Sequence, residues 1–193
     1  MNIVERVQRI LMQPAQEWHV IQQEPTQPSQ LYTGYIMPLA AIGPAASIIG
    51  LSAFAYGLYA LSIPFIIVIT VISYLLGLAG VYILALIIDA LAPSFSGQKN
   101  INQALKLVAY SYTPVWLGGI FNIFPPIAVL GLLVGLYGFY LLYLGLPVMM
   151  QVPQDKAVGY IAVAIIVMIV IFFIIAAIIG AVTTAMVTSY RLR

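Results

Sequence analysis

The sequence predicts an all-α fold: a polytopic membrane helix bundle of five transmembrane helices with a short N-terminal amphipathic interfacial helix. Hydrophobic residues make up 63% of the 193 positions, and charged residues only 6%. Soluble domains carry roughly 25% charged residues, so this chain lacks the polar groups that a water-exposed surface needs. Its apolar runs, such as 161–182, are continuous rather than alternating. Because only helices or closed barrels satisfy the backbone in lipid, continuous runs predict helices.

Residues 1–30 are the polar part of the chain and are expected to form a cytoplasmic segment. Apolar residues within 3–11 recur at helical spacing, with charged residues between them. This pattern predicts a short amphipathic helix on the membrane surface, which Pro14 ends. Trp18 is expected to be an interfacial anchor, and 22–30 to be a loop.

Residues 31–193 are expected to form one membrane domain. Each of its apolar stretches exceeds the roughly 20 residues needed to cross the hydrocarbon core. The spans are expected at about 35–56, 64–91, 102–124, 127–149 and 158–188. Pro44 should kink the first span, which is followed by an uncharged turn at 57–62.

The distribution of basic residues predicts the orientation. With five spans, the N-terminal segment and two of the four loops lie on one side of the membrane. That side carries Arg6, Arg9, Lys99, Lys106 and Lys156, against Arg191 and Arg193 on the other. The positive-inside rule therefore predicts a cytoplasmic N-terminus in a multi-pass protein of the cell membrane. The two C-terminal arginines argue mildly against the fifth crossing.

The residue types present argue against an enzyme. The chain has no cysteine, and its one histidine, His19, lies outside the expected spans. No cluster of ligands predicts a metal site, no histidine is placed to activate a nucleophile in the bilayer, and no glycine-rich phosphate loop is present. We therefore expect no catalytic residue, metal or cofactor. The net charge of +2 is too small to indicate nucleic-acid binding.

Two ionisable residues within the spans are candidates for a functional site. Asp89 lies near the end of the second span, and Lys106 near the start of the third. Such residues are costly in a membrane, so an Asp89–Lys106 ion pair is expected. In the alternative, both sit at the interface and Lys106 extends its amine to water.

The third span has a polar face. Gln103, Lys106, Tyr110 and Thr113 are spaced three or four residues apart, which places them on one side of a helix. Pro114 should break that helix and free the carbonyl of Tyr110. Substrate pathways use a polar face beside a broken helix, and so do helices that lock together; both interpretations stay open.

Several segments together resemble the bacterial branch of the Yip (Ypt-interacting protein) family. The segments are Asp89–Asn100, Gln103–Lys106, Ala109–Trp116, Tyr137–Pro147 and Pro153–Ala157 with Tyr160, together with Pro14 and Trp18. The resemblance covers almost the whole chain and implies five spans with a cytoplasmic N-terminus. Eukaryotic relatives bind Rab-type GTPases through a longer N-terminal region. Because this chain has only about 30 residues there, such binding is not expected.

Two functions follow from these observations. The first is a non-enzymatic membrane protein that organises membrane lipids or partner proteins. The alternative is a transporter or channel for a small solute or ion, with a polar site between the second and third spans. Membrane lipids are the expected partners, and the sequence leaves homo-oligomerisation open.

Overall fold

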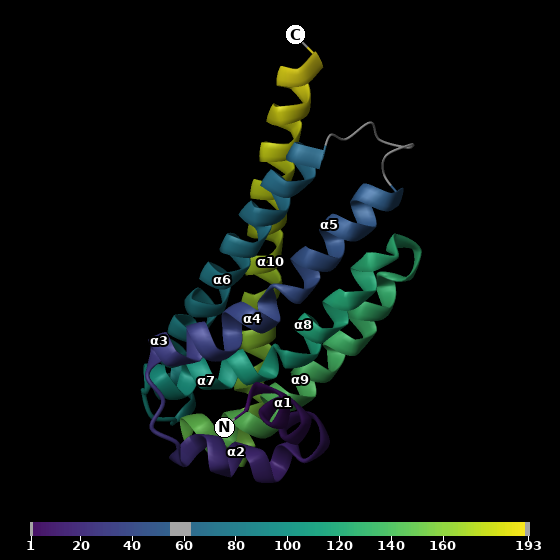
Figure 1. The fold of residues 1–193 in the computed structure, drawn as a ribbon. Helices are drawn as coiled ribbons and strands as arrows, with labels where there is room; N and C mark the ends of the chain where they lie inside the picture. Colours follow the sequence, from purple (N-terminus) through teal and green to yellow (C-terminus); the bar gives the residue numbers. More distant parts are fainter. Residues whose placement is uncertain (1, 55–62, 192–193) are drawn as a thin grey trace.

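The computed structural model describes residues 2–54 and 63–191, and every regular element within these ranges is helical. The uncharged turn expected at 57–62 lies outside the described residues. Two short helices, α1 (Ile3–Met12) and α2 (Pro14–Gln23), form a hairpin at one end of a helical bundle (Figure 1). The C-terminal end of the long helix α10 (Gln154–Arg191) lies at the opposite end.

The hairpin follows from local signals in the sequence. The side chain of Asn2 caps α1 by accepting a hydrogen bond from the Val4 amide at 3.1 Å. Pro14 ends α1 and also starts α2, where proline is tolerated at the first helical position. The apolar face of α1 packs on the bundle, and Ile10 is fully buried by protein. The expectation that this face meets the membrane surface is therefore wrong for Ile10.

The first long apolar stretch forms a series of short helices that follow one another along the bundle (Figure 1). It comprises α3 (Pro28–Leu31), a π-helical turn at Tyr32–Ile36, α4 (Met37–Ala40) and α5 (Ile42–Phe54). Its break at Ala41 lies one turn before Pro44, as the sequence predicts. It begins at Pro28, inside the segment expected to be a loop.

Three further long helices agree closely with the expected spans. They are α6 (Ile63–Leu91), α9 (Val129–Met150) and α10. A 3₁₀ turn at Ala92–Phe95 ends α6, and Gln151 ends α9 in a left-handed conformation with φ 52°. Among the described residues, four helices are long and apolar enough to span a membrane: Pro28–Ala53, Ile63–Phe95, Pro125–Met150 and Gln154–Ala185.

The third expected span, 102–124, is not one helix. It folds as α7 (Ile101–Ser111), α8 (Thr113–Gly118) and a 3₁₀ turn at Gly119–Ile123. Figure 1 shows α7 lying across the end of the bundle, whereas α8 runs beside α9. A second 3₁₀ turn, Pro125–Ile127, leads into α9.

Glycines allow α8 and the 3₁₀ turn after it to pack closely on α9 and α5. A Cβ added at Gly131 on α9 would lie 2.6 Å from the carbonyl oxygen of Gly118 on α8. One added at Gly50 on α5 would lie 2.1 Å from the carbonyl oxygen of Asn122. Both backbones therefore approach more closely than any larger residue permits.

Candidate functional site

An ionic cluster joins the two helices of the N-terminal hairpin and contacts α7 through the ring of Tyr110. The guanidinium of Arg6 pairs with the carboxylates of Glu17 and Glu24, and its Cζ lies 5.5 Å from the centre of the Tyr110 ring. Arg6 and Glu17 are each only 4% exposed. Burial alone lowers the pKa of Arg6, but the hydrogen bond to Glu24 and the neighbouring acidic groups raise it above its ordinary value. The arginine therefore stays charged in its buried position.

Two predicted site residues of α7 bind the C-terminal end of α2. Lys106 Nζ donates hydrogen bonds to the carbonyl oxygens of Ile21 at 3.0 Å and Glu24 at 2.5 Å. Gln103 Nε2 donates to the carbonyl oxygen of Gln22 at 2.8 Å. The last carbonyls of a helix have no partner within it and carry partial negative charge, so an ammonium group suits this position.

The expected Asp89–Lys106 ion pair is not formed. Lys106 turns to the carbonyls of α2, and no ion pair of Asp89 is present in the described part of the chain. Oδ1 of Asp89 is buried without a hydrogen-bond partner. Nearby, the hydroxyl of Tyr160 on α10 donates to the Ile88 carbonyl rather than to Asp89. The prediction failed because the N-terminal hairpin supplies the acceptors that Lys106 needs.

Two further hydrogen bonds hold the hairpin to α9. Gln22 Nε2 donates to the carbonyl oxygen of Val148 at 2.5 Å, and the Tyr137 hydroxyl donates to that of Leu11 at 2.9 Å. The ring of Trp18 is fully buried, so the expectation that it anchors the chain at the membrane interface is wrong. A Cβ added at Gly145 would lie 2.5 Å from Trp18 Cε2, so the indole packs directly on the backbone of α9.

An aromatic layer, formed by Tyr35, Tyr110 and Trp116, lies above the hairpin. The ring centres of Tyr35 and Tyr110 are 4.6 Å apart, and those of Tyr35 and Trp116 are 6.4 Å apart. The Tyr35 hydroxyl shares a 2.7 Å hydrogen bond with Oγ1 of the fully buried Thr113. Tyr110 and Thr113 therefore pack α7 and α8 against the π-helical turn that contains Tyr35.

The helix breaks beside Pro114, where the sequence predicts it. The chain leaves α7 at Ser111 and enters α8 at Thr113, with Pro114 in the first turn of α8. The backbone amide of Tyr112 donates to the carbonyl oxygen of Val108 at 3.0 Å. Pro114, four residues after Tyr110, has no amide to donate to the Tyr110 carbonyl.

A polar cleft of about 580 Å³ opens beside the hairpin. Side-chain amides are frequent in its walls: Gln22, Gln23, Gln27, Gln30, Asn100, Asn102 and Gln103. A smaller polar hollow of about 250 Å³ reaches Tyr35 and Tyr110 of the aromatic layer. The polar space at this end therefore stops at that layer.

A groove of about 630 Å³ lies on the other side of the aromatic layer, between α4–α5, α6, α8 and α10. The residues that line it are different from those that line the polar cleft. They are Ala40, Gly43, Pro44, Ser47, Leu51, Ile69, Thr70, Ser73, Tyr74, Gly77, Val81, Tyr112, Val115, Trp116, Gly119, Asn122, Phe172 and Ile179. None of them is charged, so the groove suits an apolar or uncharged occupant.

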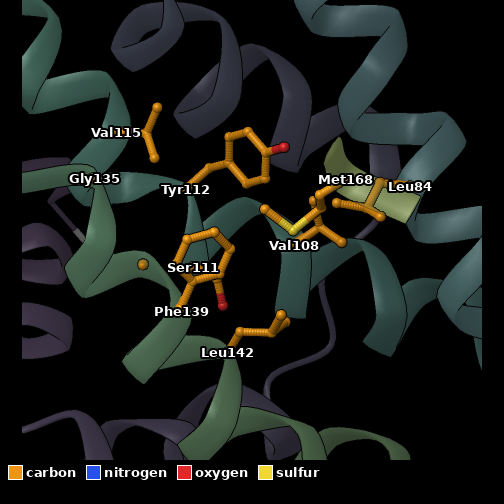
Figure 2. Close-up of a pocket in the computed structure, with 10 residues that line it drawn as sticks. Leu84, Val108, Ser111, Tyr112, Val115, Gly135, Phe139, Leu142 and Met168 are labelled. Carbon is orange, nitrogen blue, oxygen red and sulfur yellow. The ribbon is translucent and has the colours of Figure 1, made fainter. Parts of the chain in front are cut away.

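A fourth, much smaller cavity, of about 40 Å³, lies where α6 to α10 meet (Figure 2). Its walls are apolar side chains such as Leu84, Phe139 and Met168, with the hydroxyl-bearing residues Ser111 and Tyr112. The Ser111 hydroxyl is buried without a partner. At this size the cavity is far smaller than the roughly 300 Å³ of a small ligand pocket, so it is too small to hold a small-molecule ligand.

The described residues contain no group of three or more histidine, cysteine or acidic side chains placed to hold a metal ion. The residues that the sequence analysis missed are Arg6, Glu17, Glu24 and Tyr35. A signal for α2 was present, because Pro14, Glu17, Trp18 and Ile21 recur at helical spacing and all four are buried.

Known proteins resemble this chain over most of its length. The sequence model of one family, described as the Yip1 domain, matches residues 9–186. Two relatives, each named "Inner membrane protein YohC", come from Escherichia coli strain K12 and from Escherichia coli O6:H1 strain CFT073. Each is 25% identical over 155 residues, which cover 76% of this chain and 80% of the relative. No solved structure matches the chain. With its long apolar helices and a family match over nearly its whole length, this multi-pass membrane protein belongs to the Yip1 domain family.

Proposed function

We propose that this chain is a non-enzymatic protein of a bacterial inner membrane that organises membrane lipids, with five crossings and a cytoplasmic N-terminus. One observation carries the proposal: polar side chains of α7 and α8 already have structural partners. On α7, Gln103 Nε2 and Lys106 Nζ donate to backbone carbonyls at the end of α2. On α8, the Thr113 hydroxyl shares a hydrogen bond with Tyr35. Groups that already serve as structural partners are not available to replace the hydration shell of a solute.

The five crossings and the orientation rest on three supports. Residues 101–123 lead from the hairpin end to the turn before α9, and their upper part packs beside α5 and α9 (Figure 1). An odd number of crossings agrees with α1 and the end of α10 lying at opposite ends of the molecule. The basic residues favour the hairpin end as the cytoplasmic one. The relatives' name, inner membrane protein, supports the inner membrane.

A transporter or channel remains the second candidate, because Asp89 carries a buried oxygen without a partner. Its path would have to pass the aromatic layer. Tyr35 is 5% exposed, and its ring and hydroxyl both have close partners there. A solute would therefore need this packing to open.

Flux through reconstituted protein tests the proposal. Vesicles of phosphatidylethanolamine and phosphatidylglycerol, loaded with a pH-sensitive dye or with rubidium, would carry the unmutated chain, Tyr35→Ala or Asp89→Asn. We expect no flux above that of empty vesicles from any of the three. Flux from the unmutated chain that Asp89→Asn abolishes would overturn the proposal in favour of transport.

A second measurement addresses the lipids directly. Native mass spectrometry of the chain released from membrane discs should show lipid that stays bound after the surrounding lipids are removed. A chain that sheds all lipid at the same energy as a membrane helix bundle of equal size would also overturn the proposal.

A further inference from the structure

The groove between α4–α5, α6, α8 and α10 has an apolar wall that carries several polar groups without protein partners. Thr70 on α6 is 7% exposed and Trp116 on α8 is 9% exposed. Neither the Thr70 hydroxyl, the Trp116 indole N–H nor the Asn122 amide has a hydrogen-bond partner among the described residues. These three groups come from three different elements and line the same groove.

The hydroxyls of Ser47 and Tyr112 in the same groove also lack a hydrogen-bond partner among the described residues, whereas two other polar groups have one. The Ser73 hydroxyl donates to the Ile69 carbonyl at 2.8 Å, and the Tyr74 hydroxyl donates to the Met37 carbonyl at 3.1 Å. Thr70 has the same option of bonding to its own helix and does not use it. In a bilayer no water is present to satisfy such groups, so an unpartnered donor at this depth is costly.

The size and chemistry of the groove limit what can occupy it. Its volume of about 630 Å³ falls within the roughly 300–1,000 Å³ of small-molecule sites. The absence of charge among its lining residues disfavours a phosphate or carboxylate. Thr70, Trp116 and Asn122 all offer hydrogen-bond donors, so the occupant must carry acceptors.

We propose that this groove is a binding site for an uncharged lipid, whose carbonyl oxygens accept hydrogen bonds from Thr70, Trp116 and Asn122 while its chain lies against the apolar wall. This inference rests on the proposed function and deepens it by naming the lipid class. The bilayer is the source of the lipid. A charged phospholipid that places only an acyl chain in the groove would leave the three donors without partners.

Matched lipids and matched variants test the proposal. Purified protein in mild detergent would receive dioleoylglycerol or dioleoylphosphatidylglycerol, which share their chains and differ in the charged head group. Binding is measured by native mass spectrometry and by the shift in thermal unfolding. We expect dioleoylglycerol to bind and to raise the unfolding temperature, and dioleoylphosphatidylglycerol to do neither at the same concentration.

The variants separate the polar groups from the space. Thr70→Val keeps the shape of the side chain and removes the donor, so dioleoylglycerol affinity should fall about tenfold, as for one lost hydrogen bond. Ser47→Trp fills the groove and should abolish binding. The control Leu133→Trp changes an exposed side chain on α9, outside the groove, and should leave binding unchanged.

Each outcome has a definite meaning. Equal binding of both lipids, or binding that Thr70→Val and Ser47→Trp leave unchanged, would overturn the neutral-lipid site. It would not touch the proposed function, which fails only if the chain conducts solute or retains no lipid. If Ser47→Trp does not fold, the conservative Thr70→Val variant still decides.

Discussion

Removing the charge of Arg6 should release the N-terminal hairpin from the bundle. In Arg6→Gln, the Glu17 carboxylate loses its partner while its side chain stays only 5% exposed. Breaking a buried ion pair by removing one member costs about 3–5 kcal/mol, because the other charge is left uncompensated. Since 1.4 kcal/mol is a factor of ten, the hairpin should open roughly a hundredfold to a few thousandfold more often.

The chain contains no cysteine, so one introduced thiol reports this opening without interference. Ile21 on α2 is fully buried, and Ile21→Cys should react with a water-soluble maleimide only when the hairpin is open. The labelling rate in lipid discs is then compared between Ile21→Cys alone and Ile21→Cys with Arg6→Gln.

A neighbouring ion pair on the same helix supplies the control. Arg9 and Glu5 lie 2.5 Å apart, but their side chains are 49% and 47% exposed. An exposed pair contributes about 0.2–1 kcal/mol, so Arg9→Gln should raise the labelling rate at most about fivefold. Equal rates for Arg6→Gln and Arg9→Gln would refute the argument from burial. The double variant Arg6→Leu with Glu17→Leu should label more slowly than Arg6→Gln, because no buried charge is left alone.

Two further predictions concern the same end of the bundle. Gly145→Ala places a methyl group against Trp18 and should lower the stability of the protein by about 1–3 kcal/mol. In the control Gly77→Ala the added methyl group meets no atom within 4 Å, so stability should be unchanged or higher. Thermal unfolding in detergent measures both variants, and equal effects would contradict the close packing of Trp18 on Gly145. Lys106→Met leaves two carbonyls at the end of α2 without their donor and should lower the stability of the protein by about 1–3 kcal/mol. The control Lys99→Met changes an exposed side chain and should lower stability by less than about 0.5 kcal/mol. An equal loss of stability in both variants would show that the Lys106 amine is not bound to these carbonyls.

The parts of the fold set by local composition could be predicted from the sequence. A continuous apolar run of membrane length has few alternatives, so the bounds of α6 and α9 fall within two residues of the prediction. The break at Pro114 could be predicted for the same reason, because the missing amide of proline acts within its own turn.

The partners of the polar residues depend on contacts far apart in sequence and could not be predicted in the same way. Lys106 was expected to pair with the nearest opposite charge along the chain, Asp89. Its acceptors lie 85 and 82 residues away, at the end of a helix whose buried face includes Glu17. Because Glu17 is charged, the sequence pattern did not identify this face of α2 as a buried one. Membrane lipids as partners, the absence of enzymatic activity and the site residues as a functional unit remain predictions.

The ionic cluster has a physical consequence that an apolar contact would not have. The apolar face of α1 can be buried against either the end of the bundle or the membrane surface, and the hydrophobic effect alone hardly favours one position over the other. Arg6 and Glu17 both belong to the hairpin, so their pair can persist in either place, and the bundle end adds the contact with the Tyr110 ring of α7. At the bundle end, removal of Arg6 leaves the Glu17 carboxylate buried without this partner, whereas at the membrane surface that carboxylate is solvated. The loss of Arg6 therefore destabilises the bundle-end position, and because the apolar face of α1 suits lipid, the released hairpin of Arg6→Gln should move onto the lipid surface rather than into water.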